Sequence, residues 1–399
     1  MFHDLTFLQT RFRDLQNLLP PHSLHAVAVK ANPLNRLLEL LRDLGAGAEA
    51  ASPAELDLAV RAGYPAERIV FDSPVKTTDD LRRALELGVN INADSIDELK
   101  RLAELVTITP PRGAIGIRIN PQVGTGTISS SSVAGEYSKF GVPLGYYRRD
   151  VIDCFLRYKW LRGVHIHIGS QGCPLELLVG GVKRMVEFVM EVNQALADHG
   201  AGHRVEVVDI GGGLPVSYHK DRTAASLEDY WSAVEPLLSR LDPPPRSLIT
   251  EFGRYIHANA GWTVSRVEYV KTDPDLKTAM IHVGADLLLR RCYRPEDWHH
   301  EISVTDSSGR LKSGLDTTPY VIAGPLCFAG DVIAQGIRLP VIEPGDYVII
   351  HDTGAYTMSM WSRYNSRQAP KVIGYHDDGA KFEFLRERES LDDIADFWS

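Results

Sequence analysis

The sequence predicts an α/β fold: a (β/α)8 TIM barrel followed by an all-β domain. Eight short apolar runs alternate with segments of helical periodicity as far as Glu251. After Gly261 the helical segments stop, and short strands punctuated by Gly and Pro follow. Reactive side chains follow several of the barrel runs. Because all strand C-termini of a parallel barrel open on one face, we expect those side chains to share one site.

The eight apolar runs are expected to be the parallel barrel strands. They are His25–Val29, Ala46–Ala51, Arg68–Phe71, Val89–Ala93, Ala114–Ile119, Val164–Ile168, Val205–Ile210 and Ser247–Glu251. Helix periodicity and caps, such as Ser52 before Pro53, predict the helices between them. The helical segments are Leu34–Leu44, one from Pro53, Thr77–Leu87, Ser95–Leu105, Gly181–His199 and Leu227–Leu241.

The remaining features of the chain are one long loop and the boundary between the two domains. The polar segment Asn120–Gly141 is too long for an ordinary barrel joint and would lie on the catalytic face, which favours a substrate-side loop. We place the barrel at residues 5–257 and the β domain at 258–399, with residues 1–4 as candidates for the second domain. The expected β strands are Trp262–Val270, Ala279–Val283, Tyr320–Ile322, Val332–Gln335 and Asp346–Ile350.

Composition excludes several classes of protein. The 399 residues are 44% hydrophobic and 24% charged, which is typical of globular proteins. The chain has no apolar run of about 18 residues and no signal segment, so we expect a cytoplasmic protein with no membrane partner. A net charge of −9 argues against nucleic-acid binding. The four cysteines are scattered, which disfavours disulfides and a zinc site.

We also expect no other metal site. His299-His300-Glu301 offers ligand atoms, but adjacent side chains diverge on any regular element, so a solvated surface cluster is the favoured interpretation.

Four strand ends carry candidate chemistry. Lys30 follows the apolar run Val27-Ala28-Val29, where desolvation would lower its pKa and make the amine nucleophilic. Gly211-Gly212-Gly213 could bring backbone N–H groups close to a phosphate, or could be only a tight turn.

His165 and His167 alternate along one strand and point to the same side, with a structural role as the alternative. Ser170, beyond that strand, could hold a phosphate oxygen. Glu251 and Arg254 either pair with each other at the rim or serve separate partners.

Seven motifs, in order along nearly the whole chain, resemble the pyridoxal phosphate-dependent decarboxylases of the ornithine, diaminopimelate and arginine family, which have the alanine-racemase fold. The motifs are Val29-Lys30-Ala31-Asn32-Pro33, His167-Ile168-Gly169-Ser170-Gln171, Gly211-Gly212-Gly213, Glu251-Phe252-Gly253-Arg254, Gly324-Pro325-Leu326-Cys327, Gly354-Ala355-Tyr356 and Tyr364-Asn365-Ser366-Arg367.

The resemblance implies a role for each matching residue. Lys30 would hold the cofactor aldehyde, and His167 would stack on the ring with support from Arg118. Glu49 matches an acidic position near the lysine. The phosphate would be bound by Ser170, Gly211, Gly212, Gly213, Arg254 and Tyr356.

Glu251 would bond the pyridine nitrogen and keep it protonated, which favours a decarboxylase over a racemase. Cys327 would return a proton after carbon dioxide leaves. In this family the cysteine comes from the neighbouring subunit, so the resemblance implies a homodimer with shared active sites. From residue type alone, Cys327 would more often be a small buried hydrophobe.

Two departures from the family put the substrate in question. Phe328 follows Cys327, where the family has an acid that receives the substrate's distal ammonium. The altered segment Arg290-Arg291-Cys292-Tyr293-Arg294 suggests a more negative distal end, with rim salt bridges as the alternative. We therefore predict a small-molecule amino acid with an acidic or conjugated distal group, as in siderophore biosynthesis, with Arg290, Arg291, Tyr293, Phe328 and Arg118 as candidate contacts. The alternative is meso-diaminopimelate decarboxylation in lysine biosynthesis.

Two other classes of protein are disfavoured. A noncatalytic regulator should have lost Lys30, Glu251 and Cys327, which are all present. A single-barrel cofactor carrier would lack both Cys327 and the β domain.

Overall fold

The computed structural model describes residues 1–314 and 316–399, which divide into two compact units. The barrel unit comprises Gln9–Val216 and Ala224–Ile256. The C-terminal unit comprises His257–Ser399 together with two segments from earlier in the chain, Met1–Leu8 and Ser217–Thr223. Among the described residues, no helix has the length and apolar character required to cross a membrane.

The barrel unit contains a closed sheet of parallel strands, which confirms the predicted fold class. Pairing runs from β5 through β4, β3, β2, β10, β9 and β8 to β6, and β5 pairs with β6 to close the circle. A two-residue strand, β7 (Val142–Pro143), adds to the end of β6. The barrel strands are β2 (Leu24–Ala28), β3 (Gly47–Ala50), β4 (Ile69–Phe71), β5 (Asn90–Ala93), β6 (Ile115–Asn120), β8 (Leu161–His165), β9 (Val207–Asp209) and β10 (Ser247–Thr250).

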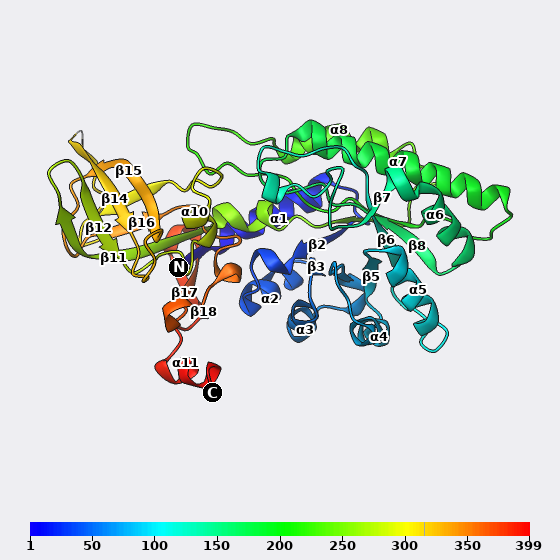
Figure 1. Cartoon of the computed structure of the whole chain (residues 1–399), viewed down its shortest axis with the longest axis horizontal. Helices are drawn as coiled ribbons and strands as arrows, with labels where there is room; N and C mark the ends of the chain where they lie inside the picture. The colour runs from blue at the N-terminus through cyan, green and yellow to red at the C-terminus, as the bar shows by residue number, and fades with distance from the viewer. Residues whose placement is uncertain (315) are drawn as a thin grey trace. The chain divides into compact units, whose positions relative to one another are not determined.

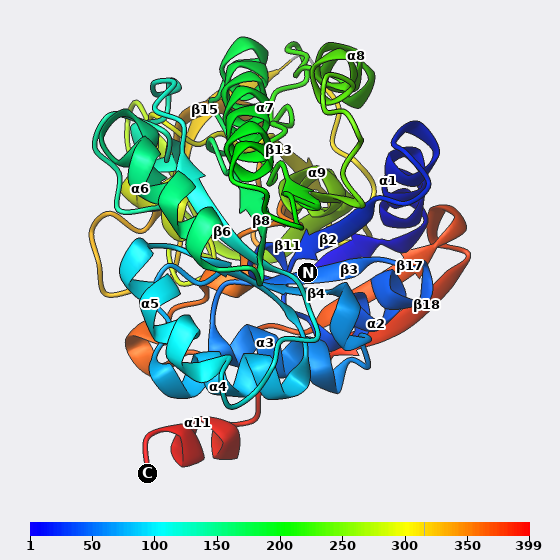
Figure 2. The same ribbon diagram turned by 90° about the vertical axis from the view of Figure 1, so that its right-hand side faces the viewer.

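Helices surround these strands, as Figure 2 shows for the barrel. Their inner faces bury Leu and Val against strands that are themselves almost fully buried. Ser52 caps its helix as predicted, because its hydroxyl accepts a hydrogen bond from the Glu55 N–H at 3.2 Å. The helices are α1 (Leu5–Leu18), α2 (Asn35–Asp43), α3 (Pro53–Arg61), α4 (Thr78–Leu87), α5 (Ile96–Leu105), α6 (Leu144–Arg157), α7 (Leu175–Asp198), α8 (Leu227–Leu238) and α9 (Arg254–His257).

The element boundaries differ from the predictions at two places that matter for the site. Strand β8 ends at His165, not Ile168, so His167 lies on the following loop. Helix α7 begins at Leu175, six residues earlier than predicted. Gly181 had suggested a helix start, but it serves packing: a Cβ there would stand 2.2 Å from Ile168 Cδ1. Helices α1 and α6 were not predicted.

The C-terminal unit is mainly sheet, drawn from yellow-green to red in Figure 1 except for its N-terminal strand, which is blue. Five of its strands were predicted, whereas β1, β13, β17, β18 and the helices α10 (Leu289–Tyr293) and α11 (Leu391–Phe397) were not. Strand β1 (Phe2–Asp4) pairs antiparallel with β11 and parallel with β17. The other strands are β11 (Gly261–Thr272), β12 (Lys277–Ile281), β13 (Ile302–Thr305), β14 (Thr317–Ala323), β15 (Val332–Pro340), β16 (Tyr347–Ile350), β17 (Val372–His376) and β18 (Lys381–Arg386).

Candidate active site in the barrel unit

Lys30 lies in a single 3-10 turn, Val29–Ala31, directly after β2. Its Nζ donates a hydrogen bond to Glu49 of the neighbouring strand β3, and the two form an ion pair. Lys30 is less desolvated than the sequence predicted, because its side chain is 37% exposed while that of Glu49 is fully buried. The amine is therefore accessible to a reactant and is positioned by a buried carboxylate.

Four carboxyl groups meet at the strand ends, and all are buried. Burial raises the pKa of Glu49 and Glu251, the latter to about 8, and the charge of Asp72 raises both further. Burial likewise raises the pKa of Asp209, with Glu251 as the next cause. Asp72 differs: although burial opposes ionisation, contact with Glu49 and the charge of Lys30 hold its pKa below the usual range. The site therefore favours a group that brings positive charge or a proton.

Two neutral histidines flank Glu251. His165 Nε2 lies 3.5 Å and His167 Nδ1 lies 3.9 Å from Glu251 Oε2, so both rings approach the same carboxylate. Alternation along one strand is not the reason, because His167 lies beyond the end of β8. Burial lowers the pKa of both rings, and the charge of Arg118 lowers that of His167 further. The Gly212 N–H donates to His167 Nδ1 at 3.2 Å, which fixes the orientation of the ring.

The glycine loop is packed too closely for any side chain. A Cβ on Gly211, Gly212 or Gly213 would lie 2.3–2.4 Å from a backbone oxygen, and Gly211 and Gly213 have positive φ. Of the three N–H groups that the sequence offered to a phosphate, two already have partners within the protein. The Gly211 N–H donates to Asp209 Oδ1 at 2.9 Å, and the Gly212 N–H is taken by His167. We keep Gly213 as the backbone candidate for an anion.

Glu251 and Arg254 have different partners, as the functional interpretation requires. Arg254 is buried, and its Nε and Nη2 donate to Ser170 Oγ at 3.2 Å. Arg118 Nη1 lies 3.8 Å from Asp94 Oδ1. The Arg118 guanidinium also stacks over the ring of Phe140, which belongs to the long polar segment Asn120–Gly141. The arginine–serine pair beside the glycine loop is suited to an anion such as phosphate.

The remaining predicted residues belong to the C-terminal unit, and their roles toward the cofactor stay predictions. Cys327 is exposed, so the reading as a small buried hydrophobe is wrong. Its N–H donates to Asn365 Oδ1 at 2.8 Å, and its carbonyl accepts from the Tyr364 hydroxyl at 2.9 Å. Phe328 stacks on Tyr293, with ring centroids 5.1 Å apart.

The arginine-rich segment is more occupied than its sequence suggested. Arg291 donates to the backbone carbonyls of Ile333, Pro295 and Trp298 at 2.6–2.7 Å, which is a structural role. Arg294 pairs with Glu296 and Asp297. The guanidinium of Arg290 lies between the rings of Trp298 and Tyr356, at 4.8 and 4.7 Å. The charge of Arg294 is therefore balanced by carboxylates, and the guanidinium of Arg291 is engaged within the protein.

Asp72, Asp209 and Asn92 were not proposed as site residues. Asp72 and Asp209 follow or end apolar strands, the same signal that selected Lys30, so the sequence could have indicated them. Asn92 lies inside β5 and donates to Asp209 Oδ2 at 3.1 Å, a contact without a sequence signal.

The donor set fits pyridoxal phosphate. Lys30 supplies an accessible amine for an aldehyde, and Arg254 with Ser170 supplies donors for a phosphate. Glu251 Oε1 is buried and, among the described residues, has no hydrogen-bond partner, so it is available to a protonated ring nitrogen. The barrel and this site together define a class of enzyme that anchors an aldehyde cofactor on a strand-end lysine.

Comparison with known proteins identifies the family. Residues 5–258 match the model for the pyridoxal binding domain of pyridoxal-dependent decarboxylases. The chain belongs to this family and is a pyridoxal phosphate-dependent amino acid decarboxylase.

Relatives extend the similarity to both units. Diaminopimelate decarboxylase of Pseudomonas fluorescens is 34% identical over 97% of this chain and 89% of its own length. That of Zymomonas mobilis is 33% identical over 93% of this chain and 85% of its own length. The crystal structure of diaminopimelate decarboxylase from Helicobacter pylori complexed with L-lysine superposes with a TM-score of 0.86 at 29% identity, covering 100% of this chain and 95% of that one.

Proposed function

We propose that this enzyme decarboxylates meso-diaminopimelate to lysine. One Cα–carboxylate bond breaks, carbon dioxide leaves, and a proton takes its place on Cα. The observation that carries the proposal is full-length similarity to diaminopimelate decarboxylases, which covers 92–98% of this chain. The lysine in the Helicobacter pylori complex is what such a reaction would produce.

The barrel residues divide the work of holding the cofactor and the proton. When bound, pyridoxal phosphate withdraws electrons from the substrate Cα, which is the chemistry that loss of carbon dioxide requires. Lys30 would attach the aldehyde, with Glu49 orienting its amine. Glu251 would face the ring nitrogen, and His167 would cover one face of the ring.

The cofactor's phosphate would be bound by side-chain and backbone donors beside the glycine loop. Arg254 and Ser170 supply side-chain donors, and Gly213 supplies backbone. Tyr356 is proposed as a further phosphate contact, but it belongs to the C-terminal unit.

Cys327 is proposed to protonate Cα. Its thiol belongs to an exposed residue, and its backbone is held on both sides by Tyr364 and Asn365. A cysteine supplied by the second subunit would make a homodimer the active form.

The prediction of a specialised substrate is not supported by the comparisons, and the engagement of Arg291 and Arg294 within the protein removes part of its basis. One observation still favours an acidic or conjugated substrate as a second candidate. Phe328 packs on Tyr293 and offers no acceptor to a distal ammonium.

A substrate panel decides between the two. We expect release of carbon dioxide from meso-diaminopimelate, with equimolar lysine, to exceed release from glutamate or from amino acids acylated at the distal amine. The Phe328→Glu variant is the matched comparison, because it restores an acceptor for the distal ammonium. Preference of the native enzyme for an acidic or acylated substrate, reversed by Phe328→Glu, would establish the second candidate.

A further inference from the structure

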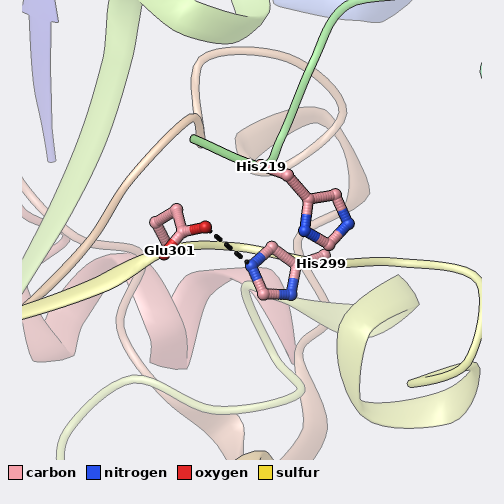
Figure 3. Close-up of side chains that lie close together, drawn as sticks. All are labelled: His219, His299 and Glu301. Atoms are coloured by element: carbon pink, nitrogen blue, oxygen red, sulfur yellow. Dashed lines mark hydrogen bonds and ion pairs between the residues drawn. The ribbon is translucent and has the colours of Figure 1, made fainter. Parts of the chain in front are cut away.

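A cluster of three potential metal ligands lies within the C-terminal unit. It consists of His219, from the segment Ser217–Thr223, and His299 and Glu301, from the segment that leads into β13 (Figure 3). One ligand atom from each residue lies within 4.8 Å of the other two. From sequence, His299-His300-Glu301 was expected to be a solvated surface cluster. His219, 80 positions away from His299, supplies the third ligand that the local sequence lacks.

The two segments are fixed against each other by packing. Tyr218 is buried and meets Trp298 and His300 edge to face, at centroid distances of 6.3 and 5.3 Å. Ser217 closes a turn around His219, donating to its carbonyl at 2.8 Å and accepting from its N–H at 3.2 Å. Asn259 in turn donates to the Ser217 carbonyl at 3.0 Å. The backbone that carries His219 is therefore held in place.

The opposite side of the cluster is anchored on the sheet. Glu301 immediately precedes β13, and its carbonyl accepts from the His351 N–H at 3.0 Å, which extends the pairing of β13 with β16. Its carboxylate accepts from the Lys220 N–H at 3.3 Å and contacts His299 Nε2 at 3.2 Å. The Lys220 contact comes from outside the ligand set and orients the carboxylate for coordination.

The two rings must turn before their nitrogens can share one ion. The imidazoles of His219 and His299 are stacked, with centroids 3.9 Å apart and planes at 12°, so their in-plane lone pairs do not converge in this state. Tetrahedral zinc with bonds of about 2.0–2.1 Å requires ligand atoms about 3.4 Å apart. Rotation of the side chains would have to supply this geometry on binding; the side chains of His299 and Glu301 are 35% and 27% exposed, so an ion and its water have access to them.

We propose that His219, His299 and Glu301 form a binding site for one divalent transition-metal ion, with zinc as the best match to two imidazoles and one carboxylate. Water would complete the coordination. The ion would fasten the segment Ser217–Thr223 to the strand β13. The chain leaves the barrel unit to make this segment and then returns to it. The site is independent of the substrate proposed above.

The test is a zinc titration of the full-length enzyme with its cofactor bound, in competition with a chromophoric chelator. We expect one zinc ion per chain, and at least about 100-fold weaker binding in His219→Ala and Glu301→Gln, because losing even outer-shell partners costs 10- to 100-fold. Cobalt should give the visible absorption of a tetrahedral site with nitrogen ligands. Magnesium should not compete, because it prefers oxygen ligands.

Two controls make the result specific. His282 forms a comparable pair with Glu268 at 2.9 Å but has no third potential ligand within residues 1–314 and 316–399, so His282→Ala should bind zinc like the native enzyme. Cys327→Ala should also retain binding, which separates this site from the exposed thiol.

Absence of stoichiometric zinc in the native enzyme, or unchanged affinity in His219→Ala, would overturn the proposal. Circular dichroism and cofactor content check that each variant is folded. If His219→Ala does not fold, His299→Gln gives the same decision.

Discussion

The two units place their reactive groups in different ways. In the barrel unit, Lys30, Glu49 and Glu251 sit at the ends of buried parallel strands, where the backbone leaves little freedom. In the C-terminal unit, Cys327 and the cluster of His219, His299 and Glu301 lie on loops with exposed or partly exposed side chains. Strand ends position a bound cofactor rigidly, whereas loops allow side chains to move toward a substrate or an ion that binds later.

The largest effect is expected from removing the lysine of the barrel site. Lys30→Ala should lower carbon dioxide release at least about 10³-fold, or about 4 kcal/mol of transition-state stabilisation. Borohydride treatment of the native enzyme should leave the cofactor covalently attached to Lys30, mapped by peptide mass spectrometry. Lys76 is the matched control, since it also pairs with a carboxylate, Glu98 at 2.7 Å, but its side chain is 0% exposed. Label on Lys76 instead would contradict the assignment.

The next effect concerns the buried acid. Glu251→Gln should retain cofactor, because Arg254 and Ser170 still hold the phosphate, yet lower kcat by about 10²- to 10³-fold. The measurement is turnover at saturating cofactor, with bound cofactor followed by absorbance. Unchanged turnover would show that the charge of Glu251 has no part in the reaction.

A third experiment tests whether Lys30, at a strand end, and Cys327, on a loop, contribute to the same active site. Lys30→Ala and Cys327→Ala chains should each be nearly inactive alone. When mixed, half of the dimers would be heterodimers with one intact site of two, so activity should recover to about a quarter of the native value. Mixtures that stay inactive despite proven subunit exchange would assign both residues to one subunit's site or make Cys327 structural.

Buried groups taken from the two units, His3 and His257 on one side and Glu251 on the other, should respond to pH in opposite directions. Burial lowers the pKa of His3 and His257 in the C-terminal unit, to about 3 and about 4. Their unfolded forms take up protons first as pH falls below about 6.5, so stability is lost from about pH 6.5 down to about 4 through His257 and down to about 3 through His3. In the barrel, the pKa of Glu251 is raised to about 8, so the unfolded state releases its proton first and stability is lost as pH rises from about 4.5 to 8.

Melting temperatures of cofactor-free protein across this range test the contrast. His257→Leu should reduce the loss of melting temperature on the acid side of the pH profile, and Glu251→Gln should reduce the loss on the basic side. If each variant instead changed the opposite side of the profile, the assignment of these two residues to the two pH responses would be wrong.

The smallest effect compares two helix caps. Ser52→Ala removes the cap of α3, which packs on the barrel, and should cost about 1 kcal/mol of unfolding free energy. Ser390→Ala removes the cap of α11, in which Ile394 is the one buried residue, and should cost less because that helix can fray locally. Denaturant titrations measure both, and equal costs would contradict the difference in packing.

The barrel could be read from the sequence because its signals are local. An apolar strand followed by Lys30 or Glu251 is visible in a few residues, and closure of the barrel then brings the strand ends together. Arg291 shows the limit: its charge was visible, but the carbonyls of Pro295, Trp298 and Ile333 that engage it are brought there by the fold. The position of His219 depends on the segment Ser217–Thr223 leaving the barrel unit, which no local pattern predicted. Phe328 could be recognised as a departure from the family's acidic residue, but its contact with Tyr293 could not be predicted.

The pairing of β1 with β17 has a consequence for how the chain folds as it is made. His3 pairs with Gly374, and Phe2 stacks on Trp262 with ring centroids 4.2 Å apart. At 5–20 residues per second, a ribosome takes roughly 20 to 70 s to travel from one strand of the β1–β17 pair to the other. The barrel segments emerge in that interval, so β1 waits with both edges unpaired until β11 and then β17 are synthesised. During synthesis the earliest strand of the C-terminal sheet is thus among the last elements to find its neighbours.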